Sequence, residues 1–174
     1  MISRRYVRRG GFRRMRKRAK YQWVREVATN VVASSPIQFD LLSNFKSRFG
    51  IIFNLPDIVI WRVHIKVSIG LTISSFTPAT AVLFALYCEN QFNVVNSFTD
   101  PYAEKFLMFD NLYAADQVLQ AGSISIPTLY KEYDIRTHRK LANMEETLFA
   151  QFTQQGNATM TAVDYTTSIL LKLP

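Results

Sequence analysis

The sequence predicts an all-β fold, a sandwich or barrel of seven or eight short strands behind a basic N-terminal arm. Its 174 residues suffice for one core and not for two. From Tyr21 onward, β-branched and aromatic residues recur in short runs separated by turn signals, which is typical of strands. There is no internal repeat and no alternation of strands with long helices, so a parallel α/β fold is not expected.

The first element is an arm over residues 1–20. It holds ten of the 21 Lys and Arg residues and none of the 13 Asp and Glu residues. Half its positions carry like charges and Gly10-Gly11 interrupts the run, so we expect the free arm to be disordered or extended. Residues 21–174 hold the remaining 11 basic and 13 acidic side chains, a net charge of −2. The folded body is therefore expected at 21–174.

The clearest strand covers residues 59–69, where two kinds of side chain alternate over the whole length. The apolar face comprises Val59, Trp61, Val63, Ile65, Val67 and Ile69, and the polar face comprises Arg62, His64, Lys66 and Ser68. This register predicts that Trp61 is buried between two layers. Pro56-Asp57 opens the strand and Gly70 follows it.

The other elements are shorter. Further strands are expected at 21–32, 81–88, 123–126, 131–137, 147–153 and 162–173. Residues 81–88 are apolar on both faces, so they predict a central strand or one that lies against another subunit. Pro127 must lie at an edge, a bulge or a break, and residues 154–157 predict a turn.

Two short helices are expected. One has Leu41, Leu42, Phe45 and Phe49 on one face and Gly50 as its cap. The other opens at Asp100-Pro101. Residues 102–113 carry more apolar surface than one short element can bury, so we expect part of this segment to contact a neighbouring subunit.

Catalytic and cofactor motifs are missing, so we expect no enzyme and no cofactor. The six glycines, at 10, 11, 50, 70, 122 and 156, allow neither GxGxxG nor a P-loop, and there is no GxSxG elbow. His64 and His138 lie among basic residues, and one cysteine with two histidines gives no common zinc spacing. The longest apolar run, 79–88, has about half the length of a membrane-spanning helix, so no membrane partner is expected.

The arm predicts binding to a nucleic acid. Its arginines form bidentate contacts with phosphates, and its aromatic rings provide surfaces for stacking unpaired bases. The expected contacts are Arg4, Arg5, Tyr6, Arg8, Arg9, Phe12, Arg13, Arg14, Arg16, Lys17, Arg18 and Lys20, with Trp23 just after them. Residues 16–20 alone suffice for a nuclear-import signal, so targeting is the alternative role, and both roles can share one arm.

The polar row Arg62, His64 and Lys66 has two interpretations. It either extends the phosphate-binding surface or forms the solvated face of a sheet, paired with acids on a neighbouring strand.

The chain resembles the capsid proteins of small circular Rep-encoding single-stranded DNA viruses. The resemblance rests on the arginine-rich arm followed, in order, by YQWVR (21–25), FDLLS (39–43), IWRVHI (60–65), DPYAE (100–104), YDIRTHRKL (133–141) and LLKLP (170–174). It implies an eight-stranded jelly roll of two packed four-stranded sheets, sixty copies of which close an icosahedral T=1 shell around a single-stranded circular DNA genome. It further implies a location in the virion, passage through the host nucleus and contact with import receptors.

Two other classes stay open. A cellular nucleic-acid-binding protein, such as a ribosomal or OB-type module with a basic tail, usually spreads basic charge over its body, whereas this body is slightly acidic. A coat protein of a small RNA or satellite virus obeys the same physics, because arm contacts to backbone and base faces do not distinguish DNA from RNA.

Overall fold

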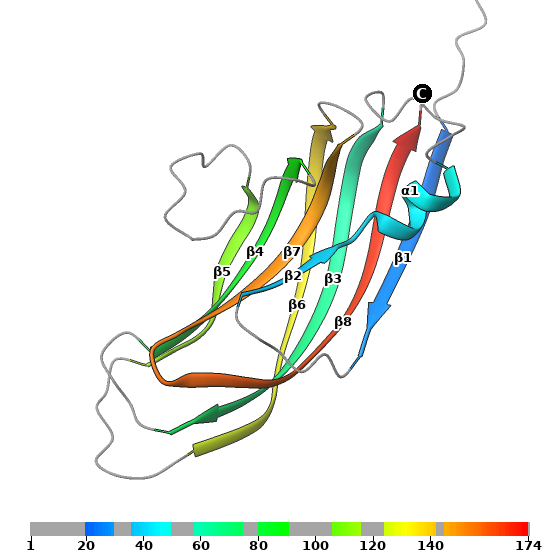
Figure 1. The fold of residues 1–174 in the computed structure, drawn as a ribbon. Helices are drawn as coiled ribbons and strands as arrows, with labels where there is room; N and C mark the ends of the chain where they lie inside the picture. Colours follow the sequence, from blue (N-terminus) through cyan, green and yellow to red (C-terminus); the bar gives the residue numbers. More distant parts are fainter. Residues whose placement is uncertain are drawn as a thin grey trace, which may run out of the picture.

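The protein folds into two four-stranded antiparallel sheets (Figure 1). The computed structural model describes residues 20–29, 36–49, 58–74, 80–90, 106–115, 124–141 and 145–173. The elements are β1 (Lys20–Ala28), β2 (Ile37–Asp40), α1 (Ser43–Phe49), β3 (Val59–Ile73), β4 (Thr80–Asn90), β5 (Phe106–Ala115), β6 (Ile124–Lys140), β7 (Glu146–Gln155) and β8 (Ala158–Leu173).

The strand order is that of a jelly roll. One sheet runs β1-β8-β3-β6 and the other β2-β7-β4-β5, so strands that follow one another along the chain mostly lie in opposite sheets. The predicted all-β sandwich of eight strands is therefore confirmed, as is the jelly roll that the resemblance implies. Strand β4 lies between β7 and β5, which confirms the central position predicted from its apolar sequence.

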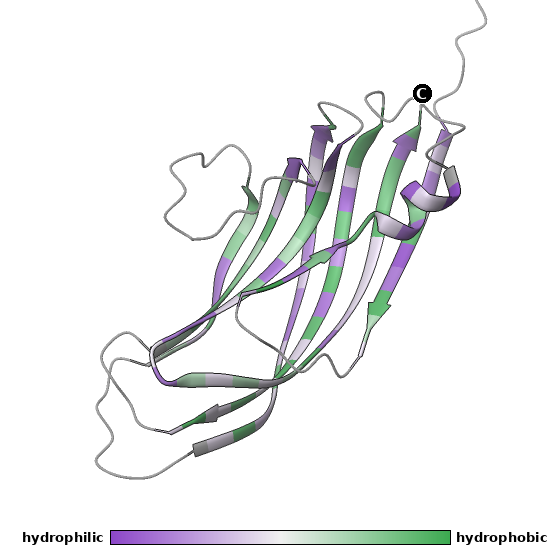
Figure 2. Ribbon diagram, in the orientation of Figure 1, coloured by the Kyte–Doolittle hydropathy of each residue, from purple (hydrophilic) through white to green (hydrophobic). Residues whose placement is uncertain are grey.

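The core lies between the two sheets and follows the alternation of the sequence (Figure 2). Val63, Ile65, Val67 and Ile69 of β3 are fully buried, as predicted. From the other sheet, Phe84 stacks on Phe152 of the neighbouring strand and on Tyr133 across the sandwich, with ring centroids 4.9 Å and 5.4 Å apart. The two sheets are thus joined by aromatic as well as aliphatic contacts.

The prediction that Val59 and Trp61 share the buried face is wrong, because a β-bulge interrupts the strand there. Along β8, Ile60 pairs with Leu171 and Arg62 with Leu170, so Trp61 is an extra residue. An extra residue reverses the alternation on one side of it. Ile60 is buried, whereas Trp61 lies on the outer face with Arg62.

A second bulge explains why the strand continues past Gly70, where the sequence predicted its end. Pairing of β3 with β6 shifts between Ile69 and Leu71: the single Gly70 faces two residues, Pro127 and Thr128, so Pro127 lies in a bulge of the edge strand β6. A Cβ at Gly70 would lie 2.6 Å from Thr161 Oγ1, too close for an ordinary contact. The edge or bulge predicted for Pro127 is confirmed, but the two strands expected around it are one continuous strand.

The helix predicted before Gly50 is confirmed as α1, with Leu41, Leu42 and Phe45 buried. Leu42 N donates a 2.8 Å hydrogen bond to Asp40 Oδ1, which caps the entry to the helix. Asn44 donates a hydrogen bond to the Glu26 carboxylate, so the helix is held against the edge strand β1. This contact protects an edge that would otherwise be open to pairing.

Other elements differ in detail. Strands β2 and β5 were not predicted, and the helix expected at Asp100-Pro101 lies outside the described residues. The turn predicted at 154–157 is confirmed, since Gly156 joins β7 to β8 with a φ of 70°. Within the described ranges, no helix has the length and apolar character required to cross a bilayer.

Candidate nucleic-acid interface

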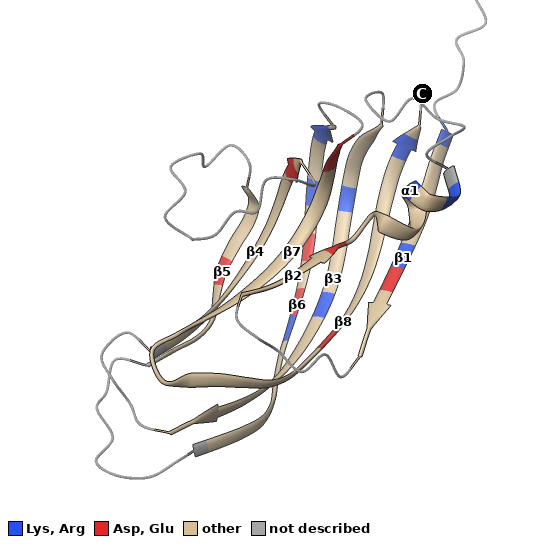
Figure 3. Cartoon of the chain, in the orientation of Figure 1, with Lys and Arg blue, Asp and Glu red and all other residues tan. Residues whose placement is uncertain are grey.

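The charges of the body separate between the two sheets (Figure 3). The strands β1, β3, β6 and β8 carry nine Lys or Arg, including Lys20 at the end of the arm, and four Asp or Glu, a net charge of +5. The strands β2, β4, β5 and β7 carry no Lys or Arg and four Asp or Glu, a net charge of −4. A body that is nearly neutral in sequence thus has one sheet suited to a polyanion.

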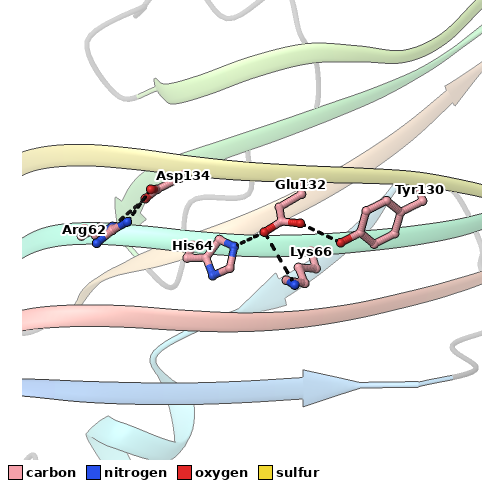
Figure 4. Close-up of polar contacts among 6 residues, drawn as sticks. All are labelled: Arg62, His64, Lys66, Tyr130, Glu132 and Asp134. Carbon is pink, nitrogen blue, oxygen red and sulfur yellow. Dashed lines mark hydrogen bonds and ion pairs between the residues drawn. The ribbon is translucent and has the colours of Figure 1, made fainter.

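The sequence-predicted row Arg62, His64 and Lys66 does share the outer face of this cationic sheet (Figure 4). Each member faces an acid of β6. Arg62 donates to both Asp134 oxygens, at 2.6 Å and 2.5 Å. His64 Nε2 lies 2.7 Å from Glu132 Oε1, and Lys66 Nζ lies 3.6 Å from the same oxygen. The structure thus shows the acid pairing that was one of the two interpretations.

These pairs favour the ionised carboxylates. The hydrogen bond from Arg62 lowers the pKa of Asp134, and the hydrogen bonds from His64 and then Tyr130 lower the pKa of Glu132. Tyr130 OH donates to Glu132 Oε2 at 2.9 Å. Because the pairs are exposed, they contribute little to stability. Their main effect is to neutralise part of the positive row near the β6 edge.

On the other side of the row, β1, β3, β8 and α1 line an open concavity of about 630 Å³. Its lining residues are Trp23, Arg25, Arg48, Arg62, His64 and Ser168. The Trp23 side chain is 51% exposed, although tryptophan usually lies in a protein interior. The lining therefore combines an accessible aromatic face with cationic groups and contains no acid.

Sequence reasoning found Trp23, Arg62 and His64 but missed Arg25, Arg48 and Ser168. Arg25 was detectable, because residues 23 and 25 of one strand lie on the same face. Arg48 was not, because its position depends on where α1 packs.

An aromatic and basic cluster lies on the same outer face, near the start of β1. The Trp61 ring lies 5.8 Å from the Tyr21 ring and 4.0 Å from His138, and Lys172 Nζ lies 5.8 Å from the indole. Lys20 is the first residue of β1 and is exposed. The other predicted arm contacts, from Arg4 to Arg18, lie outside the described residues.

One partly buried ion pair has a structural role. Arg139 Nη2 donates a 2.8 Å hydrogen bond to Glu146 Oε1, joining β6 of one sheet to β7 of the other. Cys88 is buried nearby, and burial raises its thiol pKa to about 12, so the thiol is no nucleophile at neutral pH. Within the described ranges, no three His, Cys, Asp or Glu residues come together as metal ligands.

No protein-family model matches the sequence, and no curated protein matches it. Among solved structures, the chain is similar to the Tobacco streak virus coat protein dimer, with 12% identity, TM-score 0.38, and coverage of 88% of this chain and 86% of that one. It is similar to the decameric BFDV capsid protein, with 10% identity, TM-score 0.32, and coverage of 90% and 98%. A third likeness is to the infectious bursal disease virus VP2 subviral particle, with 11% identity and TM-score 0.27 over 90% of this chain.

The chain spans only 33% of that VP2 chain. At these identities and TM-scores the likenesses carry no conclusion about function.

Proposed function

We propose that this chain is a virion structural protein, whose body self-associates into a closed T=1 shell of sixty copies and whose arm and cationic sheet hold a single-stranded circular DNA genome. The observation that carries the proposal is the joining of two positive elements. The arm, with ten cations in residues 1–20, leads into β1, an edge strand of the sheet with net charge +5.

The jelly roll supports the proposal without deciding it, because the same fold hosts unrelated functions. The charge distribution is more informative. In the proposed shell, the outer face of β1-β8-β3-β6 lies toward the genome, where its cations and the arm neutralise phosphates. Sixty arms of ten charges bring on the order of 600 positive charges into the shell, which suits a packaged strand of about a thousand to a few thousand nucleotides.

The other sheet suits contacts between proteins. On its outer face Ala85, Tyr87 and Phe149 form a buried apolar cluster, with Phe106 packed against it. Phe109, on the edge strand β5, is 48% exposed. An exposed aromatic side chain such as Phe109 is typical of protein–protein interfaces. We place a contact between copies here, in line with the expectation for residues 102–113.

Assembly on a nuclear genome requires entry into the host nucleus. The basic segment 16–20 supplies the charge pattern that import receptors recognise. It is accessible to a receptor until the genome binds the arm. Virion and host nucleus are the proposed locations.

Electron microscopy of the purified full chain tests the proposal. Uniform closed shells are expected, with nucleic acid inside that resists DNase until the shell is opened. A monodisperse monomer at all protein concentrations and salt conditions refutes self-assembly and favours the cellular nucleic-acid-binding alternative. Shells whose content is digested by RNase after opening, and not by DNase, indicate an RNA or satellite virus coat instead.

A variant lacking residues 1–19 separates the two halves of the proposal. The body is expected to keep its thermal stability, since every described strand remains, while affinity for a single strand falls steeply. A truncated chain that binds as tightly as the full chain at the same salt concentration contradicts the role of the arm in packaging and leaves it a targeting signal.

A further inference from the structure

We propose that the concavity between β1, β3, β8 and α1 is a single-strand nucleotide site, with Trp23 as the platform for one unpaired base and Arg25 and Arg48 as ligands of the adjoining phosphates. The inference rests on the proposed nucleic-acid binding and adds to it a defined site in the folded body. The binding residues that it names lie on β1 and α1, outside both the arm and the polar row of β3.

The first support is that the four basic side chains of the lining differ in whether a carboxylate is paired with them. Arg62 and His64 are held by Asp134 and Glu132 of β6. In the part of the chain that the structure describes, no carboxylate lies within ion-pair distance of Arg25 or Arg48. Among those described residues, these two guanidinium groups therefore keep open donor positions, and a phosphate accepts bidentate hydrogen bonds from such a group.

The second support is the exposure of Trp23. Its neighbour Val24 is in the core, so the strand itself is firmly placed, while the indole stands 51% exposed on the outer face. A rigid strand presenting a flat ring is a stacking surface with little ordering cost. The concavity of about 630 Å³ lies within the range of small-molecule sites and can accommodate a nucleotide.

The third support is the path of the chain. Lys20, the last residue of the arm, is three residues before Trp23 on the same strand. At about 3.3 Å per residue, the two Cα atoms lie roughly 10 Å apart, about two nucleotides of an extended strand. A nucleic acid gathered by the arm therefore reaches the Trp23 ring without a gap.

The ligand chemistry follows from the lining. A single strand offers both a free base face for the indole and phosphates for the two arginines, whereas the bases of a duplex are stacked on one another. Stacking is tolerant of sequence, so the site is expected to bind every base and to favour none by hydrogen bonding. Ser168 adds one hydroxyl to the lining of the site.

The test uses the full chain with Trp61→Phe, which leaves Trp23 as the sole indole, since the sequence has two tryptophans. An oligothymidylate titration is followed by Trp23 fluorescence and, in parallel, by the anisotropy of a labelled oligonucleotide. Quenching of Trp23 is expected with the single strand and not with inorganic tripolyphosphate at equal phosphate concentration. The reciprocal chain with Trp23→Phe, in which Trp61 is the only indole, serves as the control and is expected to show little quenching.

Variants then separate stacking from charge. Trp23→Ala is expected to weaken binding about 5- to 150-fold with an unchanged salt slope. The double variant Arg25→Gln with Arg48→Gln is expected to make the slope of log affinity against log salt shallower by about 1.4. Arg136→Gln, which removes one charge from the same face outside the concavity, is the matched control and is expected to leave Trp23 quenching within twofold. Far-UV circular dichroism checks that each variant is folded.

The outcomes distinguish this site from the general proposal. Binding by anisotropy without Trp23 quenching overturns the site while the arm still accounts for packaging. So does a loss of affinity per charge removed that is equal in Arg136→Gln and in the Arg25→Gln/Arg48→Gln double variant. Quenching by tripolyphosphate equal to that by the oligonucleotide also overturns it, because the site then takes any anion. A full chain that binds no single strand by either readout removes the proposed function itself.

Discussion

Truncation of two aromatic residues, Phe84 and Trp61, provides a sharp check of the register. Phe84 is fully buried and stacks on rings of both sheets, so Phe84→Ala removes contacts that join them. Large-to-small changes of this kind cost about 3–5 kcal/mol. A loss of that size is a large fraction of the stability of a single domain.

Trp61 has a larger ring than Phe84 but does not lie in the core. The bulge puts it on the outer face, where it contacts Tyr21 and His138 edge-on and lies below Lys172. Aromatic and cation–π contacts of such a partly exposed ring are worth about 1 kcal/mol each. Trp61→Ala is therefore expected to cost about 1–2 kcal/mol, clearly less than Phe84→Ala.

The assay is urea unfolding of dissociated subunits, followed by far-UV circular dichroism so that loss of the indole does not affect the signal. Equal m-values in the two variants and the parent chain validate the comparison. Phe84→Leu and Trp61→Phe are the conservative controls, and each is expected to recover most of the loss. A cost for Trp61→Ala equal to that for Phe84→Ala shows that the indole is in the core, as the uninterrupted alternation implied, and refutes the bulge.

Three further predictions concern charge and protonation. For the full chain, a plot of log affinity for a single strand against log salt concentration is expected to have a slope of roughly −5 to −7. Replacing Tyr6 and Phe12 with alanine should lower the affinity by about 1–3 kcal/mol per stacked base and leave the slope nearly unchanged. A slope that changes when the two rings are removed contradicts their stacking role. Glu132→Gln releases His64 and Lys66 from their shared carboxylate, so oligonucleotide titration should show tighter binding and a steeper slope, and unchanged affinity excludes the β3 row from the interface. The Cys88 thiol has a folded-state pKa of about 12, above its ordinary value of 9.0, so the unfolded chain loses this proton first as pH rises. The free energy of unfolding should then fall from about pH 9 toward pH 12, and it should fall less steeply in Cys88→Ala. The thiol should react with an aromatic disulfide reagent at pH 8 only after the chain is unfolded, and a rapid reaction of the native protein contradicts its burial.

Local pattern was sufficient for much of the fold. The alternation from Val63 to Ile69, the doubly apolar run that became β4, and the helix before Gly50 all depend on interactions between near neighbours in sequence. The arm and its ten charges are also a property of the sequence alone. The four residues of β2 are too few to show a period, and the bulge at Trp61 is defined only by pairing with β8, more than a hundred residues away.

The candidate site was also predictable from the sequence only in part. Trp23 and the row on β3 were visible in the sequence, but their partners were not, because Asp134, Glu132 and Arg48 reach them through strand pairing and helix packing. The charge separation between the sheets is likewise invisible along the chain. Successive strands mostly enter opposite sheets, so basic and acidic strands intersperse in sequence and sort into two faces only when the jelly roll closes. The sequence by itself determined the number of charges and the strands that carry them; the non-local pairing of those strands decided which charges share a surface.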